Sequence, residues 1–388
     1  MSKIGFFLYS NKIAGVENYL VNLINSWPNN KDEIYIFINL NFKHSLKFKK
    51  YFTRNIKILY YQDILNSNVY SKKNLINKLT NKINFFLLFF FYKNFFFNNF
   101  KKTKIEKFFL VNGGYPGSLY QLILAKKWKL FSKSKPWMIV HNYPKKKKII
   151  NFVIDYFIDF LFSKNLAGIS TVSNSCLKEL NKIFFLKRIK KNFIPNGIEK
   201  IKSSNLNNKI KNKLQILMIS VFEKRKGFDF IFDVLELLRK ENIKFVFYLY
   251  GDHSSEDIIN INRMLKIRNL KKYVLIKKYE TDKKKMFKNK HILVLPSRYE
   301  PFGLVLLEAM MFKVPVISTN TGGPNEILKN GENGYLVNYG DVQKMCKNIK
   351  TLFTNKRRYK SISNRGYDTF IKKYTSKQMS KKFIETLK

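Results

Sequence analysis

Short apolar runs alternate with longer amphipathic stretches along the first half of the chain. The stretch at 16–27 repeats its apolar residues every three or four positions, which predicts a helix with one buried face. The apolar runs are expected to be strands of a parallel sheet, because strands that alternate with helices form βαβ units. These runs cover residues 4–10, 34–40, 107–114, 136–142 and 166–173.

The same alternation starts again after residue 213. A helix is predicted at 228–240, and the predicted strands are 214–221, 244–252, 273–279, 291–297 and 314–320. A chain of 388 residues exceeds the size at which one hydrophobic core stops growing, so two α/β domains are expected.

The domain boundaries follow from a polar stretch and a terminal helix. Residues 196–213 are rich in Asn, Ser and Lys and are expected to link the domains. The helical pattern of 371–388 is expected to pack back on the first domain. The predicted division is therefore 1–197, 198–370 and this C-terminal helix.

The composition is strongly basic, with 74 Lys and Arg against 26 Asp and Glu. The charge is spread almost evenly over both halves, which does not indicate one nucleic-acid-binding face. Heavy use of Lys, Asn, Ile and Phe is also what an AT-rich coding sequence produces. Attraction to an anionic membrane surface is the second explanation, and nucleic-acid binding the third.

The N-terminus and the two cysteines both favour the cytoplasm. The apolar run from Ile4 to Tyr9 is short for a signal peptide and fits a buried strand. Two widely separated cysteines, Cys176 and Cys346, do not form a disulfide framework, which fits a reducing compartment. We expect a cytoplasmic protein, with the inner face of the cytoplasmic membrane as a further expected location.

The segment 84–102 is unusually rich in phenylalanine. Its longest unbroken apolar run, Phe85 to Tyr92, is far shorter than the about 20 residues that span a bilayer. Two interpretations remain open: a buried helix of the first domain, or an interfacial helix lying among lipid headgroups.

Two carboxylates flank a predicted strand–loop–helix junction. The strand Ile292–Leu295 ends at Pro296, and a helix is expected to begin at 302–304. Ligands bind at the carboxyl ends of parallel strands, and a helix N-terminus favours phosphate. Glu300 is then expected near a reacting group and Glu308 near a vicinal diol such as a ribose. The alternative is that both acids are ordinary solvated helix charges.

The sequence from Leu295 to Val337 closely resembles the signature of the family 4 retaining glycosyltransferases, also called glycosyl transferases group 1. The resemblance implies the GT-B fold, in which two Rossmann-like α/β domains face a cleft. It also implies that Glu300 faces the transferred sugar and that Glu308 binds the nucleotide ribose. By the same resemblance, the backbone that holds sugar hydroxyls and diphosphate is expected to be that of Phe302, Gly303, Leu304 and Val305.

Two further matches to this family lie in the first half. "NKIAGVENYL" resembles the loop after the first strand, with Ala14 replacing the usual first glycine and Gly15 left to admit the diphosphate. "VHNYP" places His141 where the family often has a histidine near the donor sugar. An ordinary turn and a structural histidine are the alternatives.

Two more matches lie in the second half. "VFEKRKGFDFI" resembles the loop whose lysine, here Lys226, neutralises the donor diphosphate; a surface lysine is the alternative. The family's usual arginine is replaced by Val221, so either Arg225 or Lys224 substitutes or the clamp is weaker. "YLYGDH" resembles the edge of the base pocket around Gly251.

The resemblance implies retaining transfer of a hexose-type sugar from a UDP- or GDP-sugar to a glycan or lipid-linked acceptor in cell-surface polysaccharide or lipopolysaccharide biosynthesis. No cofactor is expected, and the lack of an Asp-x-Asp pair argues against a required metal ion. Residues 145–148, four lysines, are a candidate contact for an anionic acceptor. We expect no nucleic-acid partner.

Three alternatives remain. A sugar-nucleotide epimerase or phosphorylase of the same fold would share the nucleotide features. A dinucleotide oxidoreductase would need a G-x-G-x-x-G motif after the first strand, which the sequence lacks. A nucleic-acid-binding protein would concentrate its charge on one face.

Overall fold

The computed structural model describes residues 2–10, 15–40, 42, 45–61, 103–130, 132–144, 152–201 and 212–386. The chain divides into two compact units, Met1–Ile194 with Ser380–Lys388, and Pro195–Met379. The phenylalanine-rich segment 84–102 and the lysines at 145–148 lie outside the described residues, so the predictions made for them stay predictions.

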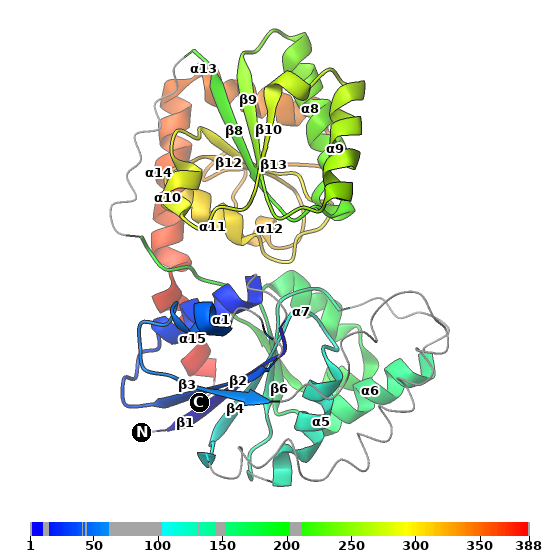
Figure 1. Ribbon diagram of the computed structural model, residues 1–388, viewed down its shortest axis with the longest axis vertical. Coiled ribbons are helices and arrows are strands. Elements are labelled where there is room, and N and C mark those ends of the chain that lie inside the picture. The colour runs from blue at the N-terminus through cyan, green and yellow to red at the C-terminus, as the bar shows by residue number, and fades with distance from the viewer. Residues whose placement is uncertain are drawn as a thin grey trace. The chain divides into compact units, whose positions relative to one another are not determined.

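The first unit is built on a seven-stranded parallel sheet in the order β3-β2-β1-β4-β5-β6-β7 (Figure 1). Its strands are β1 Lys3–Leu8, β2 Glu33–Asn39, β3 Lys57–Tyr61, β4 Lys107–Asn112, β5 Trp137–Val140, β6 Gly168–Thr171 and β7 Lys190–Phe193. Its helices are α1 Gly15–Asn25, α2 Ser45–Lys49, α5 Leu119–Lys127, α6 Phe152–Asn165 and α7 Asn174–Asn181, with the 3₁₀ turns η2 Trp128–Leu130 and η4 Phe184–Arg188.

Aromatic side chains fill the first core. Phe6 and Phe109, from neighbouring strands, stack with ring centroids 5.2 Å apart. Phe108 stacks on Trp128 at 4.1 Å with the rings 9° from parallel. Stacked rings bury a large apolar area at a low cost in side-chain entropy, which explains how a chain so rich in phenylalanine builds a defined core.

The second unit has a six-stranded parallel sheet in the order β10-β9-β8-β11-β12-β13. The strands are β8 Leu214–Ile219, β9 Phe245–Tyr250, β10 Val274–Lys277, β11 Ile292–Leu295, β12 Val316–Thr319 and β13 Tyr335–Val337. The helices are α8 Phe228–Lys240, α9 Ser255–Ile267, α10 Lys283–Phe287, α11 Leu304–Met311, α12 Pro324–Ile327, α13 Val342–Thr354 and α14 Lys356–Lys373, with the 3₁₀ turns η5 Lys224–Lys226 and η6 Lys271–Tyr273. The predicted α/β class with two parallel sheets is confirmed.

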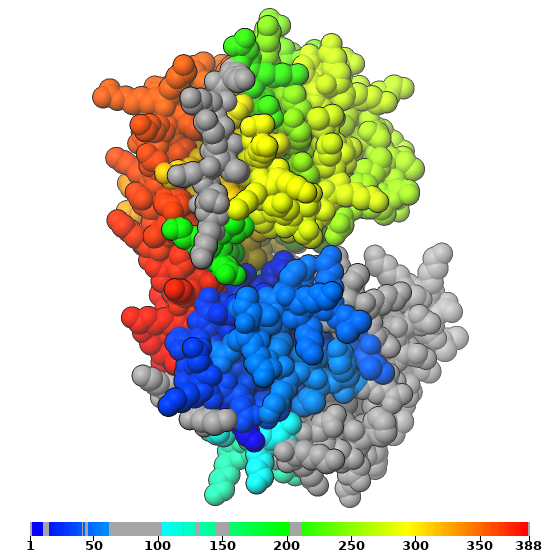
Figure 2. Space-filling model, turned by 60° about the vertical axis from the view of Figure 1, so that its left-hand side comes forward, coloured from blue at the N-terminus to red at the C-terminus, as the bar shows by residue number. Residues whose placement is uncertain are grey.

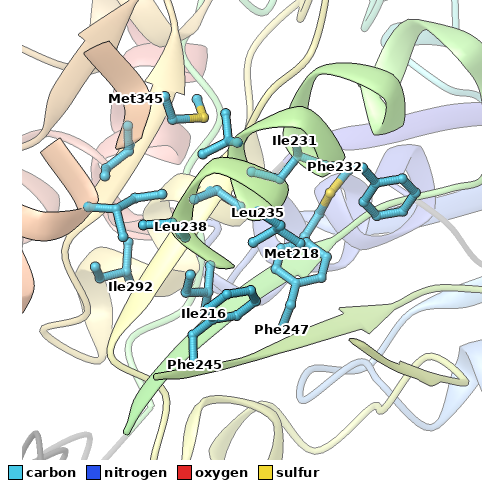
Figure 3. Close-up of a cluster of buried hydrophobic side chains, with 14 of the residues drawn as sticks. Ile216, Met218, Ile231, Phe232, Leu235, Leu238, Phe245, Phe247, Ile292 and Met345 are labelled. Atoms are coloured by element: carbon cyan, nitrogen blue, oxygen red, sulfur yellow. The ribbon is translucent and has the colours of Figure 1, made fainter. Parts of the chain in front are cut away.

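Helix α8 packs its apolar face on strands β8 and β9 (Figure 3). Ile231, Leu235 and Leu238 recur at helical spacing and are fully buried, as are Ile216 and Phe245 on the strands below them. Burying side chains of this size stabilises the fold by about 1.5–3 kcal/mol each. This packing fixes the N-terminal end of α8 beside the loop that follows β8.

The unit boundaries differ from the predicted ones. The first crossing lies at Ile194–Pro195, before residue 197, and the return lies at Met379–Ser380, after residue 371. The reason is that residue 198 bonds to the returning chain: Ile198 N donates to the Tyr374 carbonyl at 3.1 Å, and Ser376 N donates to the Ile198 carbonyl at 2.9 Å. A Cβ on Gly197 would lie 2.4 Å from the Thr375 carbonyl oxygen, so the two chain segments touch directly.

The last helix, α15 (Ser376–Thr386), joins the first unit through its final residues. Phe383 is 1% exposed and contacts the rings of Phe6, Trp27 and Phe109. Ser380 Oγ also donates to the Leu23 carbonyl at 2.8 Å. In Figure 2 the red C-terminal residues accordingly lie against blue N-terminal ones. Within the described residues, no helix is long and apolar enough to cross a membrane.

We predict that Phe383→Ala destabilises the first unit by about 3–5 kcal/mol, because it leaves a cavity among three aromatic rings. Urea unfolding followed by circular dichroism measures this change. If the two units unfold separately, only the midpoint of one transition should shift. Lys382→Ala, at an exposed neighbouring position, is the control. Equal midpoints for the two variants would contradict the assignment of this helix to the first core.

Candidate functional site

Each sheet reverses its strand order at one place. In the second unit, successive strands from β8 to β10 are added towards one edge of the sheet, and successive strands from β11 to β13 are added towards the other edge. The two strands that start these series, β8 and β11, are therefore neighbours. In the first unit the same reversal occurs between β1 and β4. Open parallel sheets bind ligands in the loops at such switch points. The loops after β8 and β11 are therefore the natural place to look for a site.

The loops after β8 and β11 are tied together by backbone contacts. Arg298 N donates to the Arg225 carbonyl at 2.7 Å. Gly227, between η5 and α8, has φ of 73°, and a Cβ there would lie 2.0 Å from the Pro296 carbonyl oxygen. A side chain at 227 would thus both strain the backbone and push the loops apart. Glycine lets Lys226 lie directly beside the loop that carries Glu300.

Glu300 is the centre of this loop pair. Lys226 Nζ lies 2.7 Å from Glu300 Oε2, and the two side chains are only 10% and 11% exposed. Ser297 Oγ lies 3.3 Å from the same oxygen, and the Glu300 carbonyl accepts from Gly323 N at 2.9 Å. Glu300 is held at both its side chain and its backbone.

Arg225 adds a second cation to Glu300. Its Nη1 lies 3.9 Å from Glu300 Oε2, while its Nε donates to Glu223 at 2.6 Å. Nη1 is buried and makes no hydrogen bond within the part of the chain that the structure describes. A buried guanidinium N–H without an acceptor is costly, and an anionic ligand oxygen would satisfy it.

Helix α11 begins directly after this loop, as predicted. Gly303 precedes it with φ of 96° and no side chain caps the helix. Gly323, of the double glycine after β12, presses on Phe302, since a Cβ there would lie 2.2 Å from the Phe302 Cα. Uncapped N–H groups at a helix start favour an anion. The backbone of Phe302, Gly303, Leu304 and Val305 forms this helix start, and its contact with sugar hydroxyls and diphosphate stays a prediction.

Glu308, on α11, is paired with a lysine that the sequence did not single out. Lys283 Nζ lies 2.9 Å from Oε1 and 3.0 Å from Oε2, and it also donates to the Tyr279 hydroxyl at 2.6 Å. Burial alone would lower the pKa of Lys283, but the charge of Glu308 and the hydrogen bonds to Tyr279 and Glu308 outweigh it and raise the pKa. Lys283 is therefore protonated at neutral pH.

Gly251 follows β9 and lies under the loop after β8. A Cβ there would lie 1.9 Å from the Ser220 carbonyl oxygen. The glycine permits close approach of two backbone segments, which is a packing reason for its presence. Its predicted contact with a nucleotide base stays a prediction.

Gly15 and His141 belong to the first unit. Gly15 opens α1 after β1, and a Cβ there would meet no atom within 4 Å. His141 follows β5, donates its backbone N–H to the Asn112 carbonyl at 3.1 Å and contacts the Tyr19 ring at 4.3 Å. Its Nε2 is buried without a hydrogen-bond partner among the described residues, and burial lowers its pKa to about 3.

Residues 199–369 match the sequence model of the family described as "Glycosyl transferases group 1". This part of the chain belongs to that family. The expected membership is confirmed there, while the narrower assignment to family 4 stays a prediction. Within the described ranges, no three His, Cys, Asp or Glu side chains are grouped so that they could hold a metal ion.

The chain is similar to two curated proteins of Staphylococcus aureus. It is 29% identical over 160 residues to the poly(ribitol-phosphate) alpha-N-acetylglucosaminyltransferase of strain COL, covering 41% of this chain and 32% of that protein. It is 27% identical over 189 residues to the capsular polysaccharide biosynthesis glycosyltransferase CapM, covering 47% and 50%. The chain thus matches half or less of these relatives' length.

A solved structure resembles the entire chain. The crystal structure of Anabaena HepE in complex with UDP and glucose has a TM-score of 0.72 at 15% identity, covering 100% of this chain and 99% of that one. At this identity the likeness shows the fold, and the expected GT-B fold is confirmed.

The structure adds residues that the sequence did not indicate. Lys283 and Tyr279 surround Glu308, and Arg298 pairs with Asp229 at 2.6 Å beside the same loops. These contacts join positions 25 and 69 residues apart, and the chain offers lysines and arginines almost everywhere. No spacing rule could select them.

We predict that the His141 imidazole stays neutral from pH 8 down to pH 5, because its pKa is near 3 rather than 6.5. Proton NMR tests this, with the resonance assigned by its loss in His141→Gln. An unfolded chain protonates this residue near pH 6.5, so the folded state loses stability as the pH falls below that value. His141→Gln should lose less stability between pH 7 and pH 4. A titration midpoint near 6.5 would show that the side chain is hydrated instead.

Proposed function

We propose that this protein is a retaining glycosyltransferase that moves a hexose-type sugar from a UDP- or GDP-sugar to a glycan or lipid-linked acceptor in cell-surface polysaccharide or lipopolysaccharide biosynthesis. The observation that carries this proposal is the convergence of Lys226 and Arg225 on Glu300 beside the start of α11. Two cations and an uncapped helix start lie together at the sheet's switch point, where a diphosphate is best accommodated.

Lys226 and Arg225 have the bonding capacity that this role requires. An ammonium has three donors, and Lys226 gives one to Glu300, so two remain for phosphate oxygens. Arg225 contributes the buried Nη1, which has no acceptor in the described part of the chain. Arg225 thereby replaces the arginine that the family carries at the position of Val221. The leaving nucleoside diphosphate gains negative charge as the bond breaks, and fixed cations stabilise that charge.

The transfer proceeds on one face of the sugar. The acceptor hydroxyl oxygen forms a bond to the anomeric carbon from the side on which the bond to the diphosphate oxygen breaks. The acceptor's proton passes to a departing phosphate oxygen, and the electron pair of the broken bond stays on the diphosphate. No protein base is needed, so Glu300 serves to orient the sugar hydroxyls and Glu308 to bind the ribose. Because Lys226 and Arg225 supply the positive charge, turnover should not require a metal ion.

Similarity to known proteins supports the substrate classes. HepE, which shares the fold, has been solved with UDP and glucose, and the two staphylococcal relatives are glycosyltransferases of poly(ribitol-phosphate) and capsular polysaccharide. The roles of Gly15 and His141, which lie in the first unit, stay predictions. A same-fold epimerase or phosphorylase would share the nucleotide contacts but would yield no transferred sugar.

We predict that Lys226→Met lowers kcat/KM by about 10²–10³-fold, since one preorganised group opposite the developing charge is lost. Arg225→Met should also lower it, because it removes the buried Nη1 that has no acceptor among the described residues. The measurement is nucleoside diphosphate release with product analysis over a panel of UDP- and GDP-sugars. Lys224→Met, an exposed neighbour in the same turn, is the control.

Near-wild-type turnover of Lys226→Met with a good donor would contradict the role of Lys226 in binding the diphosphate. Donor breakdown without sugar transfer to any acceptor would favour the epimerase or phosphorylase alternative. An inverted anomeric configuration in the product, seen by NMR, would contradict the retaining mechanism.

An exposed aromatic patch on the first unit supports peripheral binding to an anionic membrane, at the inner face of the cytoplasmic membrane. The patch consists of Tyr156 and Phe160 on α6 with Phe184 and Phe185 in η4, whose rings contact one another. Phe184 is 62% exposed. The exposed cations Lys164, Lys187 and Arg188 lie on the same two elements. Aromatic rings flanked by cations favour the headgroup region of anionic bilayers.

We predict that the protein sediments with phosphatidylglycerol vesicles and not with phosphatidylcholine vesicles at low salt. The double change Phe160→Ser and Phe184→Ser should reduce binding several-fold, because it removes the groups that insert. Leu275→Ser, an exposed apolar position of the second unit, is the control. Equal vesicle binding by both variants would show that the aromatic patch does not bind the membrane. Turnover of soluble, uncharged acceptors by a protein that does not bind vesicles would refute the membrane role.

A further inference from the structure

Glu308 is held by two residues from a different part of the chain. Lys283 is the first residue of α10, and Tyr279 lies in the loop between β10 and that helix. The side chains of Lys283 and Glu308 are 19% and 14% exposed, so most of the ion pair is out of water. A carboxylate this buried needs compensating donors to stay ionised.

The hydrogen-bond inventory of Lys283 is complete. Its ammonium has three donors, and the structure gives it three acceptors: Oε1 and Oε2 of Glu308 and the hydroxyl of Tyr279. The ammonium also lies 4.8 Å from the centre of the Tyr279 ring. No donor of Lys283 remains for a ligand. Its effect on a ligand must therefore pass through Glu308.

About half of the hydrogen-bond acceptor positions of Glu308 are used by Lys283. An ionised carboxylate has about four acceptor positions, and Lys283 takes one on each oxygen. Within the part of the chain that the structure describes, two positions remain, one on each oxygen, which is the number that the 2′- and 3′-hydroxyls of a ribose require. The lysine therefore does not compete with the diol and can stay in place while the diol binds.

We propose that Lys283, oriented by Tyr279, is a positioning residue that fixes the Glu308 carboxylate to receive both hydroxyls of the donor ribose. This inference rests on the proposed function, which assigns Glu308 to the ribose. It adds that affinity for the nucleotide depends on a cation that never contacts it. A carboxylate held on both oxygens loses less rotational freedom on binding than an unheld one.

A ligand-truncation cycle tests the proposal. The probe is UDP or GDP, whichever the wild-type protein binds more tightly, compared with its 2′,3′-dideoxy analogue by calorimetry. Lys283→Met removes the donors and keeps the apolar stem, and Tyr279→Phe removes only the hydroxyl. Lys285→Met makes the same charge change at an exposed position of the same short helix and is the control.

The expected result is specific to the diol. Lys283→Met should bind the ribonucleotide about tenfold more weakly, the value of a charged hydrogen bond, and the dideoxy analogue as tightly as wild type does. Tyr279→Phe should show a smaller loss of the same kind, and Lys285→Met none. With a working donor, the loss should appear in KM while kcat is nearly unchanged.

Two results would overturn the proposal. Lys283→Met and Tyr279→Phe could both bind the ribonucleotide as wild type does, so that neither positions the carboxylate. Alternatively, both could lose equal affinity for the two nucleotides, as a general loosening or a lost long-range attraction would cause. A wild-type protein that binds both nucleotides equally would instead refute the ribose role of Glu308, and this proposal with it.

Discussion

The ion pair between Lys226 and Glu300 is the contact on which the candidate site depends. It joins the loop after β8 to the loop after β11, at the place where the strand order of the sheet reverses. Removing water from both charges is expensive, and the 2.7 Å contact offsets that cost only while the two loops stay together. The absence of a side chain at Gly227 permits that approach, and Gly323 lets the loop after β12 lie against Phe302 of the loop after β11. The ion pair and the two glycines thus hold the backbone of these loops and the start of α11 together.

The strands that the sequence predicts well are those buried on both faces. β11 is an unbroken apolar run, and β8 and β12 are mostly apolar or fully buried, because a parallel sheet covered by helices leaves no solvent-facing side. The strands β3 and β7 were not predicted from the apolar runs. They lie at the edges of the first sheet and carry exposed residues, and β7 reads Lys-Lys-Asn-Phe. Their strand character comes from the neighbour they pair with rather than from their own composition.

The candidate site divides in the same way. Glu300, the helix start at Leu304 and the double glycine lie within one stretch, so their spacing reports their geometry. Lys283 meets Glu308 only because β10 and β11 bring their following segments together on one end of the sheet. The observed domain boundaries differ from the predicted ones for a related reason. Ile198 forms a β-bridge with Thr375, and no local sequence pattern predicts this contact.

Because cations are in large excess, the presence of an ion pair does not by itself mark a functional site in this chain. Whether the pair is buried is more informative. With 74 Lys and Arg against 26 acids, a carboxylate on this surface finds a cation readily, as Glu332 finds Lys329 with 57% and 72% of their side chains exposed. Such pairs contribute about 0–1 kcal/mol and are screened by salt. The Lys226–Glu300 and Lys283–Glu308 pairs are at most 19% exposed on either partner. Dissolved ions reach these two pairs poorly, so salt screens them only weakly. Salt does screen the long-range attraction between a diphosphate and the many exposed cations of this basic protein.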